Sequence, residues 1–354
     1  MSVRGTAPIV GLTRRAALRR AVACLRGARS VLITTHLGAD PDGLGSALAL
    51  ASALERIGIP AQIALGCTVP ARYRYMDRAA KATVYGPDDP LPEADVAVVL
   101  DTSSGWDRVG TPGKAIAARH AAKQCTIVCL DHHPHAAIAI DVPVLDAQAT
   151  ATAVLVYQLI LLLAHDVTPE EAGWLYLGIV TDTASFRFPN TNAEAHRTVA
   201  DLADRGADER RLYAEMYEAT SVASIRLLGE ALQGIQVTCD GHMAVMTVTQ
   251  EQFARYGLAV EDVPGFADHA ATVEGAEIGA ALLEFPDNRT RVILRASGNA
   301  PVDTIAKALG GGGHTFAAAA VIDGNADDAL RMLVAISCPY LTPDLPHAIS
   351  PAAD

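Results

Sequence analysis

Three short apolar runs, each ending in a histidine or an aspartate, limit the folds open to this chain of 354 residues. The runs are VLITTH, VAVVLD and TIVCLD, at residues 31–36, 96–101 and 126–131. Continuous apolar runs of this length are typical of strands that are covered on both faces, as in a parallel sheet. Because helical patterns such as residues 45–57 lie between the runs, we predict a doubly wound, mainly parallel α/β domain.

Two further helices are expected to pack on this sheet. The apolar stretch at residues 153–164 is too short to span a bilayer, so it is predicted to be a core helix. A second helix begins after Thr168, which can cap it, with Pro169 at its first position and Glu171 completing a capping box. This helix continues through WLYLGIVTDT and places Asp182 at the end of a very apolar stretch.

The pattern changes after residue 235. Short β-type runs follow at residues 242–248, 279–285 and 291–297. The triplet Pro286-Asp287-Asn288 supplies a turn between the last two runs, and a glycine-rich loop at residues 310–314 precedes an alanine-rich segment. We therefore predict a second, smaller α/β domain with a mixed sheet.

Residues 206–235 have a helical pattern with one polar face and are predicted to connect the two domains. The predicted boundaries are 13–220 for the first domain and 221–345 for the second. We expect the active site in the cleft between them, because ligand sites occur preferentially at domain interfaces.

Charge and composition exclude several classes of protein. The formal net charge of −12 argues against a protein that coats long duplex DNA or an anionic membrane. A short nucleic-acid ligand stays open, because a small cationic site or a bound metal can override the global sign locally. The N-terminus lacks the apolar core of a signal peptide, and the six cysteines form no C-x-x-C pair. We expect a cytoplasmic protein without a disulfide framework.

The first motif that carries chemistry is H-x-x-x-D-x-D, formed by His36, Asp40 and Asp42 directly after a predicted strand. Oxygen donors combined with an imidazole suit Mn²⁺ or Mg²⁺ better than an ion that prefers thiolates. The alternative is that His36 packs at the strand end while the aspartates cap the next helix. The motif alone leaves these two interpretations equally open.

The ends of the other two runs add further titratable side chains. Asp101 ends the second run, where an aspartate by itself is usually a cap or a turn residue. The third run ends in Asp131-His132-His133. One of the adjacent histidines could bind a metal while the other faces a substrate. In a parallel sheet these residues converge, because ligands bind at the carboxyl ends of the strands.

Asp182 is the single residue that most strongly indicates a bound cation. It lies at the end of an apolar helix, where burying an unpaired carboxylate would cost several kcal/mol. A metal ion would remove that cost, although an exposed or capping role is the alternative. Together these segments offer enough ligands for two metals that share a bridging carboxylate. Such a pair can bind a phosphoryl group and lower the pKa of a water.

Five ordered motifs give the chain a specific resemblance to a known family. HLGADPDGLGS, VVLDTSS, LDHHP and GIVTDTASFRF resemble the DHH superfamily of phosphoesterases, and VILRAS with IAKALGGGGH resembles the DHH-associated domain of one subfamily. The resemblance covers residues from about 15 to 325. Within the superfamily the chain is most similar to the bacterial bifunctional oligoribonuclease/pAp phosphatase (nanoRNase) type.

The resemblance implies a set of site residues and two Mn²⁺ ions, with Mg²⁺ or Co²⁺ as alternatives. One metal would be bound by His36, Asp40 and Asp101, and the second by Asp42, Asp101, His132 and Asp182. His133 would contact the scissile phosphate, and Asp101 would take part in catalysis as the bridging ligand. A substrate clamp would consist of Arg295, Gly311, Gly312, Gly313 and His314, with Arg187 as a further phosphate contact.

Two positions depart from the family pattern. Ala184 stands where relatives often have glycine, and the segment after His314 is Thr-Phe-Ala-Ala-Ala-Ala in place of a glycine-rich continuation. The second change affects the expected shape of the nucleotide end of the site. Neither position is a predicted metal ligand.

The leading functional prediction is hydrolysis of short oligonucleotides, dinucleotides or pAp by a water activated between two metals. The alternatives are a cyclic-dinucleotide phosphodiesterase and a catalytically silent nucleotide-binding regulator. Inorganic pyrophosphatases share the first-domain motifs, but the pattern of Arg295 and the glycine run argues against them. We expect no membrane or long-duplex partner, and a homodimer stays open.

Overall fold

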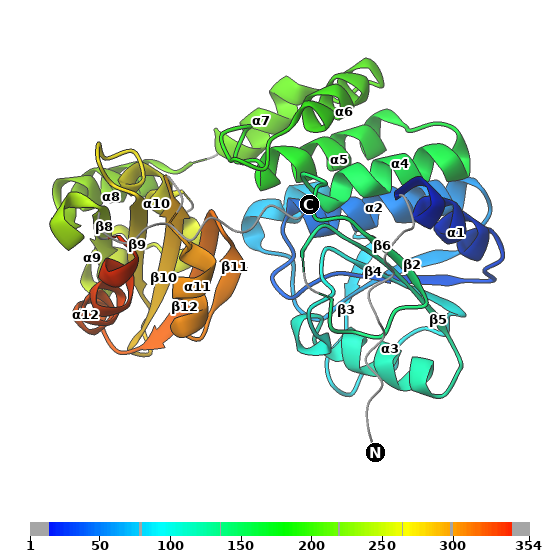
Figure 1. Cartoon of the computed structure of the whole chain (residues 1–354), viewed down its shortest axis with the longest axis horizontal. Helices are drawn as coiled ribbons and strands as arrows, with labels where there is room; N and C mark the ends of the chain where they lie inside the picture. Colours follow the sequence, from blue (N-terminus) through cyan, green and yellow to red (C-terminus); the bar gives the residue numbers. More distant parts are fainter. Residues whose placement is uncertain are drawn as a thin grey trace, which may run out of the picture. The chain divides into compact units, whose positions relative to one another are not determined.

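The computed structural model describes residues 14–77, 80–134, 136–218, 220–263, 265–297 and 300–341. These residues form two compact units that divide between residues 219 and 220, and each unit has its own sheet and core (Figure 1). The first 13 residues, in which we expect no signal peptide, lie outside the described part of the chain.

The first unit contains a six-stranded sheet in the order β3-β2-β1-β4-β5-β6, and all neighbouring strands pair in parallel. The strands are β1 (Val31–Thr34), β2 (Ala61–Leu65), β3 (Ala82–Val84), β4 (Val96–Leu100), β5 (Thr126–Asp131) and β6 (Val142–Leu145). The three apolar runs therefore form strands as predicted. Because β1 lies beside β4, the chain reverses its direction of winding between them, which is where such sheets bind ligands.

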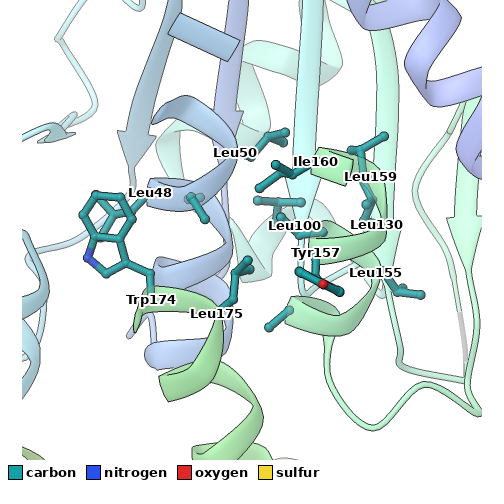
Figure 2. Close-up of a cluster of buried hydrophobic side chains, with 14 of the residues drawn as sticks. Leu48, Leu50, Leu100, Leu130, Leu155, Tyr157, Leu159, Ile160, Trp174 and Leu175 are labelled. Atoms are coloured by element: carbon teal, nitrogen blue, oxygen red, sulfur yellow. The ribbon is translucent and has the colours of Figure 1, made fainter. Parts of the chain in front are cut away.

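Helices cover both faces of this sheet, which confirms the doubly wound prediction (Figure 1). One face packs against α1 (Arg14–Arg26), α2 (Pro41–Arg56), α4 (Thr152–Ala164) and α5 (Pro169–Asp182), and the other against α3 (Thr111–Ala121). Successive strand residues alternate between the two cores: Ile33 lies in the first and Leu32 in the second. Figure 2 shows the first core, where Leu100 and Leu130 of the sheet lie beneath α2, α4 and α5.

Helix α5 begins as predicted. The Thr168 hydroxyl accepts a hydrogen bond from the Glu171 amide at 3.2 Å, and the Glu171 carboxylate accepts one from the Thr168 amide at 2.9 Å. The helix then packs closely against α2 and α4 at Gly178. A Cβ atom at Gly178 would lie only 2.9 Å from Asp42 Oδ1 and 2.8 Å from Ala153 Cβ. Glycine at this position therefore lets α5 approach the segment that carries Asp42.

Residues 206–235 are mainly helical, as predicted, and the two units divide within this segment. The segment forms two helices, α7 (Glu209–Tyr217) and α8 (Val222–Gln233), which follow α6 (Ala193–Asp204). The break has a local cause, because the Ser221 side chain accepts a hydrogen bond from the Ser224 amide and starts a new helix. Helix α8 belongs to the core of the second unit, where Leu227 is fully buried.

The second unit contains a mixed sheet, as predicted, in the order β11-β12-β10-β9-β8-β7. The strands are β7 (Gln236–Thr238), β8 (Met243–Val248), β9 (Ile278–Glu284), β10 (Arg289–Ala296), β11 (Gly312–His314) and β12 (Ala317–Asp323). Only the pair of β8 and β9 is parallel among the described strands of this sheet. The predicted turn joins β9 to β10, and the Phe285 amide donates to the Arg289 carbonyl across it at 2.7 Å.

Five helices cover the two faces of the mixed sheet. One face packs against α8, α9 (Gln250–Tyr256) and α10 (Phe266–Ala270), and the other against α11 (Val302–Ala308) and α12 (Ala326–Ser337). Short 3₁₀ helices complete the described structure of the chain: η1 (Ala71–Asp77), η2 (Trp106–Arg108), η3 (Cys239–Gly241), η4 (Val260–Asp262) and η5 (Cys338–Tyr340).

The glycine-rich segment, expected as a loop, ends in a strand. Gly312 to His314 form β11, an edge strand that pairs with β12, and the Gly311 amide donates to the Ala306 carbonyl at 2.7 Å. Gly313 has a φ of 145°, and a Cβ atom there would lie 2.5 Å from the Ala317 carbonyl oxygen. At this position the close approach of the two strands requires glycine.

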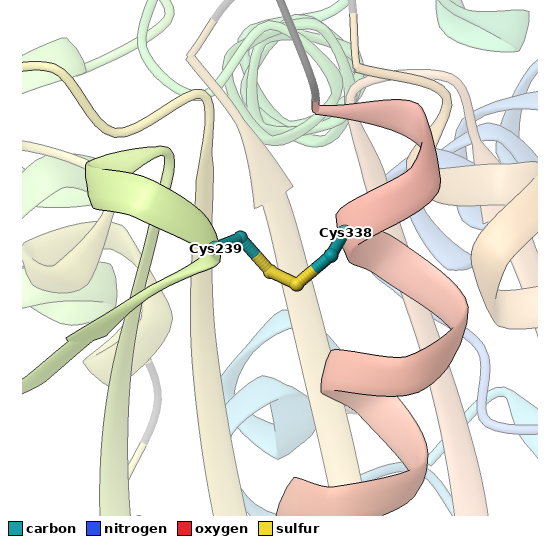
Figure 3. Close-up of a disulfide and its surroundings, with 2 residues drawn as sticks. All are labelled: Cys239 and Cys338. Atoms are coloured by element: carbon teal, nitrogen blue, oxygen red, sulfur yellow. A yellow bond between two sulfur atoms is a disulfide. The ribbon is translucent and has the colours of Figure 1, made fainter.

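One disulfide, between Cys239 and Cys338, is present although the sequence predicts no disulfide framework (Figure 3). It joins the end of β7 to the end of α12 across 99 residues of sequence. It is a single crosslink within the second unit, and its long sequence separation gives no spacing signal. The cysteines at positions 24, 67, 125 and 129 are free thiols.

No helix in the described part of the chain is long and apolar enough to cross a lipid bilayer.

Candidate metal centre

The predicted ligands lie at the carboxyl ends of three adjacent strands in the first unit. His36 follows β1 and Asp101 directly follows β4, while Asp131 ends β5 and is followed by His132. Because β1, β4 and β5 are neighbours in the sheet, their ends bring these side chains together. The reversal of winding between β1 and β4 places His36 and Asp101 on adjacent strands.

A first cluster contains His36, Asp40 and Asp101. His36 Nε2 lies 3.4 Å from Asp101 Oδ2 and 3.7 Å from Asp40 Oδ1. The other ring nitrogen, Nδ1, lies 3.0 Å from the Leu37 carbonyl oxygen, which can only accept, so Nε2 carries the lone pair in the neutral ring. Asp40 also caps α2 through hydrogen bonds from two backbone amides, so the capping alternative and the ligand geometry coexist.

A second cluster contains Asp42, Asp101, His132 and Asp182. His132 Nε2 lies 3.5 Å from Asp101 Oδ1 and 3.0 Å from Asp182 Oδ2. The Ala149 carbonyl oxygen lies 3.3 Å from His132 Nδ1 and orients the ring in the same way as in the first cluster. Asp182 contributes from the end of α5, as predicted from its apolar surroundings.

Asp42 is fully buried and is held by the start of α4. Its two carboxylate oxygens accept hydrogen bonds from the Thr152 and Ala153 amides, both at 2.7 Å. The Thr152 hydroxyl also donates to Asp101 Oδ1 at 3.0 Å. The first turn of α4 therefore fixes both carboxylates and places the positive end of its dipole against them.

His133 belongs to a hydrogen-bonded chain beside the two clusters. Its Nδ1 lies 2.7 Å from Asp131 Oδ1, and the Ser103 hydroxyl donates to Asp131 Oδ2 at 2.5 Å. Asp131 is fully buried whereas the His133 side chain is 29% exposed. The buried carboxylate therefore fixes the orientation of a ring that reaches solvent.

Electrostatics in the centre are dominated by crowded carboxylates. Burial raises the pKa of Asp42 well above its usual range, and the negative charges of Asp101 and Asp182 raise it further. Burial by itself lowers the pKa of His36, but the carboxylates of Asp101 and Asp40 outweigh it and hold that pKa well above the usual value. Burial also opposes ionisation of Asp101, yet the three neighbouring imidazoles keep its pKa below the usual range.

These residues fit a divalent cation. Among the described residues of the first unit, three groups each place one ligand atom per residue within 4.8 Å of the others: His36–Asp40–Asp101, Asp42–Asp101–His132 and Asp101–Asp131–His133. Carboxylate oxygens and imidazole nitrogens suit Mn²⁺, Mg²⁺ and similar ions. A cation would also offset the repulsion that raises the pKa of Asp42. The structure thus brings all six predicted ligands into one continuous cluster.

Three residues hold the predicted site residues in place in ways that the sequence does not indicate. Asp131 belongs to a predicted motif, but its contact with His133 depends on the turn after β5. Thr152 touches two of the predicted ligands from a helix start far along the chain. Asn190 donates from Nδ2 to the carbonyls of Thr150 and Asp182 and so ties the end of α5 to the start of α4. No local pattern signals the last two.

The segment after Asp182 is a left-handed turn. Ala184, Ser185 and Phe186 have φ values of 47°, 59° and 65°. Arg187 follows this turn, and its Nε donates to the Ala184 carbonyl at 2.9 Å. The proposed phosphate contact of Arg187 stays a prediction, and its position depends on this strained turn.

Replacing Ala184 with glycine is expected to stabilise the first unit by about 0.5 kcal/mol. Alanine at positive φ costs about 1–2 kcal/mol, and glycine recovers this but gives back about 0.4–1 kcal/mol through the more flexible unfolded chain. Urea unfolding of the full chain measures the difference. The matched control is Ala200→Gly in α6, which should lower the stability by about 1 kcal/mol. Destabilisation by both variants would contradict the strain at Ala184.

The predicted substrate clamp lies in the second unit. Arg295 is on β10, where its Nε lies 3.4 Å from Asp268 Oδ1 and its Nη1 donates to the Leu294 carbonyl at 3.1 Å. His314 ends β11, and its ring stacks on Phe316 with centroids 5.4 Å apart. The roles of Arg295, His314 and Gly311 to Gly313 in substrate binding stay predictions.

Comparison with known proteins supports the resemblance indicated by the motifs. Residues 30–179 match the DHH family, N-terminal domain, a segment that contains every predicted metal ligand except Asp182. The resemblance to this family is therefore confirmed.

Relatives extend the similarity over most of the chain. It is 29% identical over 295 residues to the bifunctional oligoribonuclease and PAP phosphatase NrnA of Thermus thermophilus, covering 83% of this chain and 84% of the relative. The protein of the same name from Bacillus subtilis is 24% identical over 86% of this chain and 92% of its own length. A crystal structure of an exopolyphosphatase-related protein from Bacteroides fragilis shares the fold, with a TM-score of 0.84 and 22% identity over 95% of this chain and 99% of its own.

Proposed function

We propose that this chain is a metal-dependent phosphoesterase that hydrolyses short oligonucleotides and pAp with two divalent cations, preferably Mn²⁺. His36, Asp40 and Asp101 would hold one ion, and Asp42, Asp101, His132 and Asp182 the other. Asp101 carries the proposal. Its Oδ2 lies 3.4 Å from His36 Nε2 and its Oδ1 lies 3.5 Å from His132 Nε2, so each oxygen faces a different cluster. A carboxylate with one oxygen toward each cluster can bridge two ions.

The protein's own groups prepare the site for this reaction. Two divalent cations in such a site would polarise the phosphoryl group and lower the pKa of a water that attacks it. The Thr152 and Ala153 amides and the Thr152 hydroxyl hold Asp42 and Asp101 in place, which limits reorganisation of the ligands. Asn190 fixes the end of α5 and therefore the position of Asp182.

His133 is proposed to donate a proton to the leaving oxygen. Asp131 accepts from Nδ1 at 2.7 Å and would stabilise the protonated ring, and Ser103 holds Asp131. The partial exposure of His133 would allow contact with a substrate, unlike the buried His132. In this proposal Asp131 is a positioning residue for the general acid.

The substrate class rests on the relatives and on charge. Both relatives named above carry oligoribonuclease and PAP phosphatase activities in their names, and the matches span most of each chain. A net charge of −12 disfavours a long polyanion but permits a short one that is bound by metals and a few basic groups. Arg295 would supply one such group through its guanidinium fork.

A substrate panel tests the proposal. Labelled dinucleotides, five-nucleotide RNA, pAp and a cyclic dinucleotide are incubated with the full chain and Mn²⁺, Mg²⁺, Co²⁺ or a chelator. We expect turnover of the linear substrates and pAp, fastest with Mn²⁺, and none with the chelator. Hydrolysis of the cyclic dinucleotide alone would replace the proposal with the cyclic-dinucleotide alternative. Metal binding without any turnover would favour a silent regulator.

A further inference from the structure

Strand β10 presents two arginines on one face of the mixed sheet. Its even-numbered residues Val292 and Leu294 are fully buried in the core beneath α11 and α12. Side chains alternate along a strand, so Arg291 and Arg295 lie on the opposite face, where both are partly exposed. The two arginines therefore share one surface of the second unit.

Strand β12, next to β10, carries small side chains on this face, so few side chains project from the surface beside the arginines. Arg295 pairs in register with Ala317, and Ile293 with Ala319. Ala317 and Ala319 are partly exposed, whereas the even-numbered Ala318 and Ala320 of the same strand are buried. Gly312 of the edge strand lies opposite Ala319. From Ile293 to the sheet edge this face thus carries the small residues Ala319 and Gly312, over which a ligand backbone can pass closely, whereas Arg291 lies beside the exposed Val321.

Spacing along β10 separates the backbone positions of the two arginines. Arg291 and Arg295 are four residues apart, which corresponds to about 14 Å along an antiparallel strand. This spacing allows the two arginines to contact two different phosphates of one ligand. Arg295 is oriented by Asp268 and by the Leu294 carbonyl, whereas Arg291 lies opposite Val321 and Leu283 of the flanking strands.

Aromatic rings next to Arg295 point to a nucleotide ligand. His314 pairs in register with Ala317, the cross-strand neighbour of Arg295. Its ring stacks on Phe316 with an interplanar angle of 2°. Proteins that bind single-stranded nucleic acid combine basic groups that follow the backbone with aromatic groups that stack on bases. A ligand that consists of phosphates alone has no base that could stack on these aromatic rings.

We propose that Arg291 is a length-determining contact for single-stranded oligonucleotides, binding a phosphate one or more nucleotides away from the phosphate at Arg295. This inference rests on the proposed function, in which Arg295 contacts a phosphate of the short substrates. Substrates with too few phosphates, such as pAp or a dinucleotide, reach Arg295 but not Arg291. Longer single strands reach both, so Arg291 raises the preference for them.

The test compares Arg291→Met with the wild type on substrates of increasing length. Methionine keeps the apolar stem and removes the charge. For the five-nucleotide RNA we expect kcat/KM to fall about tenfold, the scale of one charge-assisted hydrogen bond, with pAp and the dinucleotide unchanged. The slope of log(kcat/KM) against log(salt) for the long substrate should lose about 0.7, the value for one phosphate contact on a single strand.

The control is Arg331→Met on α12, which removes the same charge from a helix on the opposite face of the sheet. It should leave all substrates unchanged. Equal losses on short and long substrates, or no loss on any, would overturn the role of Arg291.

Binding of a fluorescent five-nucleotide RNA and of labelled pAp, measured by anisotropy with the metals chelated, separates this inference from the proposed function. A selective tenfold loss of RNA binding in Arg291→Met supports the inference, whether or not the wild type hydrolyses any substrate. Absence of hydrolysis by the wild type would reject only the proposed function. Equal RNA binding by both proteins rejects the inference, whatever the wild type hydrolyses.

Discussion

Replacing Asp101 with asparagine is expected to lower kcat/KM for a dinucleotide by more than about a hundredfold. Changes that only touch the groups supporting metal ligands already cost about 10–100-fold, and Asp101 is proposed to bind both ions itself. Its two oxygens face His36 and His132 at 3.4 and 3.5 Å, so a neutral amide would weaken both sites at once. Steady-state hydrolysis with Mn²⁺ and the bound metal per chain, measured by elemental analysis, report the two effects.

Stability gives this prediction a second readout. Without metal, Asp101→Asn should be less stable than the wild type, because the neighbouring imidazoles that hold the pKa of Asp101 below its usual range lose their charged partner. The backbone adds no further cost, since asparagine tolerates the left-handed conformation at this position, where φ is 58°. Added Mn²⁺ should then raise the melting temperature of the wild type more than that of the variant, since a ligand stabilises in proportion to its binding.

Asp141→Asn is the matched control. Asp141 lies just before β6, at the amino ends of the parallel strands, whereas the predicted ligands lie at their carboxyl ends. It should keep the activity and the metal-induced shift in melting temperature. Wild-type activity in Asp101→Asn, or an equal shift with Mn²⁺, would rule out the bridging role.

The ligand cluster is predictable from the sequence because it depends on local signals. A strand covered on both faces must be apolar throughout, so the first polar residue after it marks the strand end. Parallel strands put their carboxyl ends on one edge, so the sequence predicts that His36, Asp101 and His132 lie on that edge. Their close approach also depends on β1, β4 and β5 being neighbours in the sheet. Asp182 is recognisable for a different reason, since a carboxylate buried at the end of an apolar helix is costly unless a cation or a hydrogen-bond partner offsets its charge.

Features that depend on contacts between distant segments are not predictable in this way. Thr152 meets Asp42 only because α4 begins beside the strand ends, and the disulfide joins residues 99 positions apart. The glycine run shows that composition alone does not predict the secondary structure of a segment. Glycine suits a loop and a tightly packed edge strand equally, and only the pairing with β12 selects the strand. Likewise, a serine within a helical pattern caps a new helix at Ser221.

Replacing His133 with asparagine is expected to lower kcat for a dinucleotide by about 10²–10⁴-fold, the usual contribution of a general acid. The ring is held by Asp131 at 2.7 Å and is partly exposed, so its loss removes a proton donor without removing a proposed metal ligand. Metal content and the shift in melting temperature with Mn²⁺ should therefore stay at wild-type values. Rapid assays with the dinucleotide and with a nitrophenyl phosphodiester provide the measurement.

The choice of leaving group distinguishes proton donation from simple phosphate binding. A nitrophenyl phosphodiester releases an anion that needs no proton, so His133→Asn should hydrolyse it nearly as fast as the wild type does. The matched control is His120→Asn, whose ring pairs with Asp141 on the far edge of the sheet and should affect neither substrate. If His133 only stabilised charge on the phosphate, both substrates would slow by the same factor. Equal slowing would thus remove the general acid from the proposed mechanism while leaving the metal centre intact.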